Sequence, residues 1–126
     1  MVAVIDDDLS VLKAMRRLLS MHGFDTELYD SPGKFLDALI TTRAICLIVD
    51  IHLGDSCGVE FVRQLANRGI TFPVIFMTGS DNEEIAIQAS EAGCVAFFRK
   101  PFFSAYLLIE ALNGLPDSYA VIRPRK

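Results

Sequence analysis

The segment Ile45-Cys46-Leu47-Ile48-Val49-Asp50 decides the fold, because five consecutive apolar residues lead directly into a carboxylate. A short continuous apolar run predicts a strand that is buried on both faces, as in parallel sheets covered by helices. Similar runs occupy residues 2–5, 73–77 and 95–98, and a more polar run at residues 24–29 predicts an edge strand. The chain therefore contains five predicted strands, and Asp50 ends the central one.

Helical spacing of apolar residues separates these strands and predicts helices over residues 9–21, 31–41, 59–67, 81–92 and 103–113. Ser31 and Pro32 favour the start of a helix, and Gly23 favours the end of one. Five strand–helix units in succession predict an α/β fold with a doubly wound, five-stranded parallel sheet and helices on both faces. We expect one domain over residues 1–113 and a tail or linker over residues 114–126.

The composition excludes several classes of protein. The 126 residues are 52% hydrophobic with a net charge of −4, so we expect neither disorder nor direct nucleic-acid binding. No segment approaches the ~20 apolar residues of a membrane span, and we expect the first residues to form a strand and not a signal peptide. The odd number of cysteines, 3, argues against a disulfide framework or a structural zinc site. We therefore expect a cytoplasmic protein with free thiols.

The chemistry-bearing residues gather at the carboxyl ends of the strands, where open α/β sheets bind ligands. Asp6 and Asp7 follow the first strand, Asp50 ends the third, and Thr78 and Lys100 follow the fourth and fifth. Crowded carboxylates repel one another unless a cation joins them, and Mg²⁺ prefers oxygen ligands beside a phosphate. The Thr78 hydroxyl and the Lys100 ammonium would hold oxygen atoms of a phosphoryl group, and an aspartate can be the nucleophile that accepts this group. The pattern predicts metal-assisted phosphorylation of a carboxylate.

Four motifs at these strand ends resemble the receiver domain of bacterial two-component response regulators. They are Val4-Ile5-Asp6-Asp7, Leu47-Ile48-Val49-Asp50, Met77-Thr78-Gly79 and Lys100-Pro101-Phe102, and the resemblance covers about residues 2–113. Residues 4–8, 29–32 and 73–79 are most similar to the nitrogen-fixation regulator type. The resemblance implies a flavodoxin-like sheet with the strand order 2-1-3-4-5.

The resemblance also implies the roles of individual residues. Asp50 is the phosphoacceptor, and the Mg²⁺ ligands are Asp6, Asp7, Asp50 and the backbone carbonyl of His52. Thr78 and Lys100 contact the phosphoryl group, and Pro101 follows Lys100, usually through a cis peptide.

The expected activity is that of a switch and not of an enzyme. A histidine kinase supplies the phosphoryl group, Thr78 moves inward, and Phe97 is the aromatic switch residue. The surface of the fourth helix, fifth strand and fifth helix then changes to control an output such as transcription. The resemblance allows a homodimer on phosphorylation and an effector or DNA-binding domain outside this chain.

The loop after Asp50 departs from the family pattern Met-Pro-x-Met-Asp-Gly. Gly54 replaces the proline and allows positive φ, and Ser56 and Cys57 replace the methionine and aspartate. These residues border the expected site, as do Gly79 and Ser80. The changes bear on phosphorylation rate and partner fit.

Three other functions compete with the switch. A receiver-like interaction module that has lost phosphorylation usually lacks an acid, the threonine or the lysine, and this chain keeps them all. An aspartate-nucleophile phosphatase of the haloacid dehalogenase class requires a second acid where His52 stands. A flavodoxin requires a phosphate-binding loop after the first strand, where three acids would repel phosphate.

Overall fold

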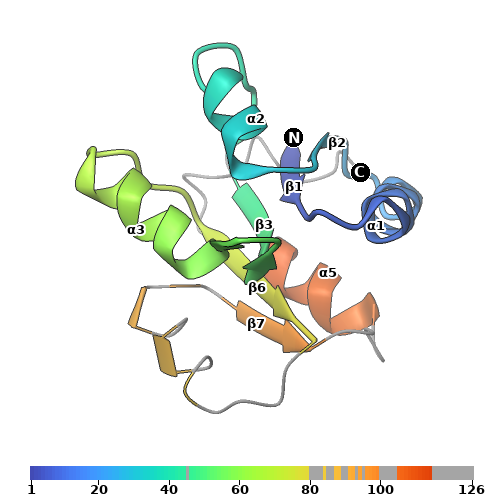
Figure 1. The fold of residues 1–126 in the computed structure, drawn as a ribbon. Helices are drawn as coiled ribbons and strands as arrows, with labels where there is room; N and C mark the ends of the chain where they lie inside the picture. The colour runs from blue at the N-terminus through green and yellow to red at the C-terminus, as the bar shows by residue number, and fades with distance from the viewer. Residues whose placement is uncertain are drawn as a thin grey trace.

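The computed structural model describes residues 1–44, 46–79, 84, 87–88, 91–92, 94, 96–99 and 105–114 (Figure 1). Five parallel strands form its main sheet: β1 (Val2–Ile5), β2 (Thr26–Tyr29), β3 (Cys46–Asp50), β6 (Val74–Thr78) and β7 (Ala96–Arg99). Their order is β2-β1-β3-β6-β7, which is the predicted order 2-1-3-4-5 when only these strands are counted. The strand that ends in Asp50 is central, as predicted.

Helices cover both faces of this sheet (Figure 1). They are α1 (Leu9–Met21), α2 (Pro32–Asp37), α3 (Gly58–Asn67) and α5 (Ala105–Asn113). Successive strand residues point to opposite faces, so the sheet contributes to two separate cores. One core packs Phe35 of α2 and Phe61 and Leu65 of α3 against Leu47 and Val49 of β3.

The other core packs α1 and α5 against the opposite face of the sheet. Leu12, Leu19 and Leu112 contact the cluster that contains Cys46 and Ile48 of β3. All five residues of β3 are buried. Burial on both faces explains why the sequence of β3 is apolar throughout. The prediction of helices on both faces of the sheet is confirmed.

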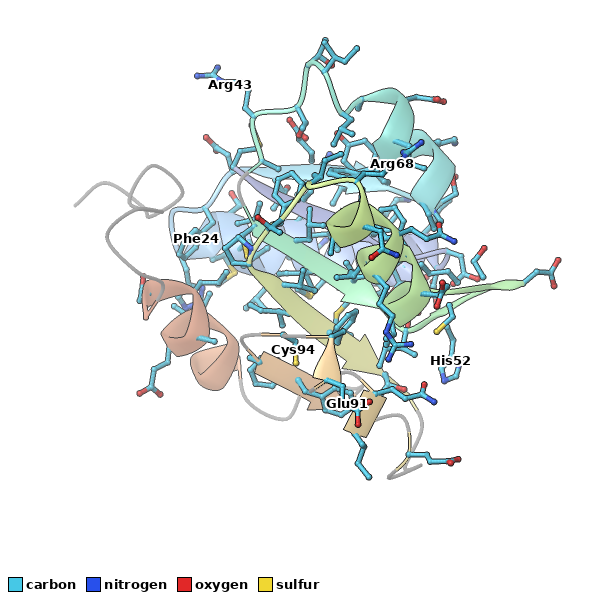
Figure 2. All side chains as sticks on the ribbon, turned by 90° about the vertical axis from the view of Figure 1, so that its left-hand side faces the viewer. Phe24, Arg43, His52, Arg68, Glu91 and Cys94 are labelled. Carbon is cyan, nitrogen blue, oxygen red and sulfur yellow. The ribbon has the colours of Figure 1, made fainter. Side chains whose placement is uncertain are left out.

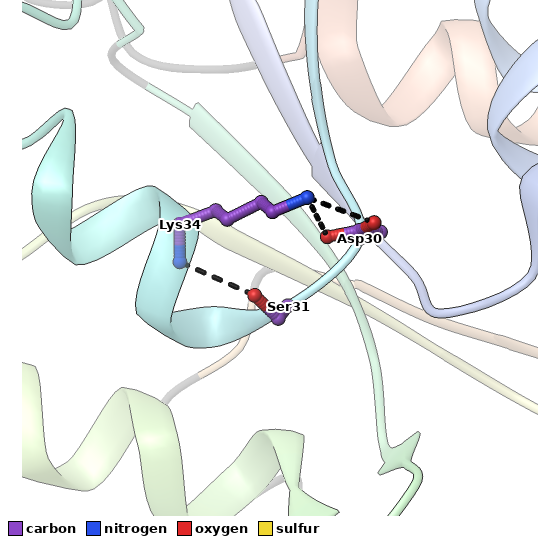
Figure 3. Close-up of polar contacts among 3 residues, drawn as sticks. All are labelled: Asp30, Ser31 and Lys34. Carbon is purple, nitrogen blue, oxygen red and sulfur yellow. Dashed lines mark hydrogen bonds and ion pairs between the residues drawn. The ribbon is translucent and has the colours of Figure 1, made fainter.

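Local sequence signals determine the junction between β2 and α2 (Figure 3). Ser31 Oγ accepts a hydrogen bond from Lys34 N at 3.2 Å, and Pro32 is the first helical residue. The helix ends at Asp37 and not at residue 41 as predicted. Residues 38–41 form turns instead, in which Leu39 N–H donates to Leu36 O and the N–H groups of Thr41 and Thr42 both donate to Ala38 O.

The segment over residues 51–58, predicted as a loop, contains a short β-hairpin. Strands β4 (His52–Leu53) and β5 (Ser56–Cys57) pair antiparallel across the turn residues Gly54 and Asp55. Gly54 has φ +63°, as a type II′ hairpin turn requires at its first central residue. Two-residue strands are too short to show periodicity, so the sequence pattern could not reveal them.

Two predicted helices are described only in part. In the helix predicted over residues 81–92, residues 84, 87–88 and 91 are helical, and the remainder lies outside the described residues. The helix predicted over residues 103–113 is described from residue 105 as α5.

Candidate functional site

Three carboxylates converge at the carboxyl edge of the sheet, as the sequence predicts. Oxygen atoms of Asp6, Asp7 and Asp50 all lie within 4.8 Å of one another. Asp6 follows β1 and Asp50 ends β3, and the two strands pair in register up to Ile5 and Val49. Asp6 is 0% and Asp50 5% exposed, whereas Asp7 is exposed. Like charges this close repel, so the arrangement favours a bound cation.

Backbone hydrogen bonds orient the two buried carboxylates. Asp6 Oδ1 accepts a bond from the backbone N–H of Asp8 at 2.9 Å, and Asp50 Oδ1 accepts one from His52 N–H at 3.1 Å. Asp8 itself caps α1, because its Oδ1 accepts the N–H of Ser10 at 2.8 Å. The third acid of this run is therefore engaged in helix capping.

Asp30 follows β2 but is not a member of this carboxylate cluster. Its carboxylate lies 3.0 Å from the Lys34 Nζ in an exposed ion pair (Figure 3). A lysine partner on the next helical turn satisfies its charge locally.

The donor set fits Mg²⁺. All three groups offer carboxylate oxygen, the ligand that this ion prefers. The exposure of Asp7 gives the site access to water, and Mg²⁺ usually retains several water ligands. The carbonyl of His52 remains a predicted ligand. Figure 2 shows His52 at the edge toward which the strand arrows point, consistent with this position.

The β4–β5 hairpin borders the carboxylates. A Cβ at Gly54 would lie 3.7 Å from Asp7 Oδ2, so the hairpin turn is next to the cluster. Ser56 and Cys57 are both exposed, and so is Gly79 after β6. Gly54 uses the freedom that glycine allows at this position, since its φ of +63° is closed to proline.

Thr78 ends β6 at the same edge and is completely buried. Strand β6 is paired with β3, and the preceding residue, Met77, is the register partner of Asp50. Phe97, on the adjacent strand β7, is partly buried and packs against the core on the α2–α3 face. The predicted residues Ser80, Lys100 and Pro101 lie outside the described residues.

Gly58 is the residue that sequence reasoning missed. It is the first residue of α3, its N–H donates to Ile51 O at 2.7 Å, and a Cβ on it would overlap the carbonyl oxygen of Asp50. The final glycine of the family loop pattern stands at this position, but the pattern does not reveal the contact, which depends on how α3 packs against the end of β3.

Comparison with known proteins adds to this geometry. The family model of the response regulator receiver domain matches residues 2–113. This chain belongs to the response regulator receiver family. The predicted resemblance is therefore confirmed, and this receiver domain is a protein of two-component systems.

Two curated relatives are regulators. The chain is 35% identical over 107 residues to the response regulator protein TodT of Pseudomonas putida, covering 85% of this chain and 47% of TodT. It is 34% identical over 112 residues to the transcriptional regulatory protein FixJ of Rhizobium meliloti, covering 89% of this chain and 54% of FixJ. The chain thus spans about half the length of these relatives.

A solved structure supports the same assignment. The response regulator receiver protein from Burkholderia phymatum superposes with a TM-score of 0.78 at 38% identity, covering 99% of this chain and 98% of that protein. No helix in the part of our chain that the structure describes has the length and apolar character needed to cross a membrane.

Proposed function

We propose that this receiver domain is a phosphorylation-operated switch in which Asp50 accepts a phosphoryl group from a histidine kinase. The observation that carries the proposal is the convergence of Asp6, Asp7 and Asp50 at the carboxyl edge of the sheet. In the proposed transfer, the bond between phosphorus and the kinase histidine nitrogen breaks as a bond forms to an Asp50 carboxylate oxygen.

The domain's own residues prepare this transfer. The N–H of His52 holds Asp50 Oδ1 at 3.1 Å and so orients the nucleophile. We assign Asp6, Asp7, Asp50 and the His52 carbonyl as Mg²⁺ ligands. A bound Mg²⁺ would neutralise the charge that the phosphoryl group brings to these acids.

Thr78 and Lys100 complete the proposed phosphoryl site. The Thr78 hydroxyl would donate to one phosphoryl oxygen, and the Lys100 ammonium would pair with another. Inward movement of Thr78 would then be coupled to a movement of the Phe97 side chain. Together these movements would change the surface around β7 and α5. We expect this surface to be the place of self-association or effector contact.

The output proposed for this switch is control of transcription. Relatives about twice as long include a transcriptional regulatory protein, which supports an effector domain that follows the receiver. The matched range supports a receiver domain over residues 1–113, with residues 114–126 as a tail or linker. In this proposal the domain acts in the cytoplasm and phosphorylates no other protein.

Acetyl phosphate tests the proposal directly. With Mg²⁺, the parent chain should gain one phosphoryl group in its intact mass, and Asp50→Asn should gain none. Asp55→Asn is the matched control, since Asp55 is an exposed acid on the nearby hairpin turn and should leave labelling unchanged. Labelling of Asp50→Asn to the parent's extent would refute the assignment, and an unlabelled parent would favour the interaction-module alternative.

A further inference from the structure

The β4–β5 hairpin brings together two side chains that the phosphorylation mechanism does not use. His52 and Cys57 are direct partners across the hairpin. The neighbouring pair is hydrogen-bonded, since Gly58 N–H donates to Ile51 O at 2.7 Å. Because such pairs alternate along an antiparallel ladder, His52 and Cys57 form a non-hydrogen-bonded pair, in which the side chains stand closest.

Both side chains are available to a ligand. His52 and Cys57 are exposed, and Figure 2 shows His52 at the outer edge of the domain. Cys57 is the N-cap residue of α3, yet its side chain makes no capping hydrogen bond. Within the described residues, no hydrogen bond or ion pair occupies the His52 imidazole or the Cys57 thiol.

The surroundings attract a cation. The hairpin lies beside Asp6, Asp7 and Asp50, and its turn carries a further exposed acid, Asp55. A cluster of negative charge raises the local concentration of cations. Imidazole and thiolate prefer a softer ion than the all-oxygen cluster does.

We propose that the side chains of His52 and Cys57 form a second metal site, which binds a borderline-soft divalent ion such as Zn²⁺, distinct from the ion of the carboxylate cluster. The imidazole nitrogen and the sulfur supply two ligands, and water completes the coordination. The thiol releases its proton to solvent as the metal–sulfur bond forms. Cysteine spacing along the chain could not predict this pair, because the hairpin creates it.

The test uses Cd²⁺ as the probe, because a cadmium–thiolate bond gives an ultraviolet charge-transfer band. The full chain is titrated in excess Mg²⁺, which saturates the carboxylate cluster, with a reductant that contains no thiol. The parent should show one bound Cd²⁺ with this band. Cys57→Ser should abolish the band, and His52→Ala should weaken binding by more than about tenfold, since even outer-shell losses reduce metal affinity roughly 10–100-fold.

Two controls separate this site from others. Cys94→Ala should keep the band, since Cys94 is a half-buried thiol elsewhere. Asp50→Asn should also keep it, since the carboxylates are not ligands of this ion. The proposal is overturned if the parent shows no band, if His52→Ala binds Cd²⁺ like the parent, or if either control loses the band. None of these results bears on phosphorylation of Asp50.

Discussion

The carbonyl oxygen of Asp50 lies against the backbone of Gly58, with no space for a side chain between them. A Cβ on Gly58 would overlap this oxygen and would lie 2.9 Å from Val49 Cγ1. Glycine at this position lets the start of α3 approach the end of β3, where the proposed phosphoacceptor lies.

Gly58→Ala should therefore destabilise the domain. The added methyl group must displace either α3 or the end of β3, and overpacking of this kind usually lowers the free energy of unfolding by about 1–3 kcal/mol. Urea denaturation measures the change. The matched control is Gly33→Ala in α2, where a Cβ would meet nothing closer than Ser31 Oγ at 4.0 Å. Gly33→Ala should be neutral or stabilising by up to ~1 kcal/mol, and equal effects of the two substitutions would contradict the close contact.

The fold could be predicted from the sequence because burial in this sheet has a simple pattern. The continuous apolar run of β3 indicates burial on both faces, and parallel strands place their carboxyl ends at one edge. The grouping of Asp6 with Asp50 follows from these two facts. The same reasoning places Thr78 at this edge, where the structure has it at the end of β6.

Other features depend on tertiary contacts that the sequence pattern does not contain. The β4–β5 hairpin is too short to show alternation, and the pairing of His52 with Cys57 follows only from its register. The approach of Gly58 to Asp50 depends on the packing of α3. Helix α2 gives way to turns after Asp37, and the exact end of a helix is a feature that the sequence pattern does not determine.

Asp7→Ala should separate metal binding from stability. Removal of one of three crowded carboxylates relieves repulsion, so the free energy of unfolding without metal should stay equal or rise. Mg²⁺ affinity, measured by calorimetric titration, should fall by at least about tenfold, because a ligand is lost.

Asp8→Ala is the complementary variant. It removes the N-cap of α1 and should lower the free energy of unfolding by about 1 kcal/mol while Mg²⁺ affinity stays unchanged. If Asp7→Ala binds Mg²⁺ like the parent, Asp7 is not a ligand.

Glu27 should make stability depend on pH in the acid range. Burial raises the pKa of its carboxyl. Three hydrogen bonds lower this pKa by more than burial raises it, and their donors are the Thr42 hydroxyl, the Tyr29 hydroxyl and the Arg43 N–H. The pKa in the folded protein is thus below the ordinary value of 4.5. A carboxyl group whose pKa is lowered by folding stabilises the folded protein at pH values above its unfolded-state pKa. This stabilisation is lost as the pH falls through the folded-state pKa.

Glu27→Gln should accordingly be less stable than the parent near pH 7, and the difference should shrink as the pH falls below about 4. Urea denaturation at several pH values measures this. Glu60→Gln provides the comparison, since Glu60 is exposed, and its 3.9 Å contact with Arg63 and its place in the first turn of α3 should each contribute less than about 1 kcal/mol, so a smaller change is expected. A Glu27→Gln deficit that persists undiminished at about pH 3 would show that the carboxylate charge is not its cause.

Thr78→Ala should uncouple phosphorylation from the structural response. Thr78 is buried at the end of β6, next to β7, where Phe97 lies opposite Phe76. A new hydrogen bond from its hydroxyl to a phosphoryl oxygen would be charge-assisted and worth roughly 1.5–3 kcal/mol, enough to shift a two-state equilibrium. Without the hydroxyl, Asp50 should still be labelled by acetyl phosphate, but strand β7 and helix α5 should not respond.

Amide NMR with and without beryllofluoride, a phosphoryl mimic, measures the response. In the parent, amide shifts of Ala96–Arg99 and Ala105–Asn113 should change on addition, and in Thr78→Ala they should stay near their starting values. Thr78→Ser retains the hydroxyl and should restore the change, which separates loss of the hydrogen bond from damage to the core. If Thr78→Ala shifts these amides as the parent does, the switch operates through another residue, and Phe97 has to be coupled to Asp50 by a different route.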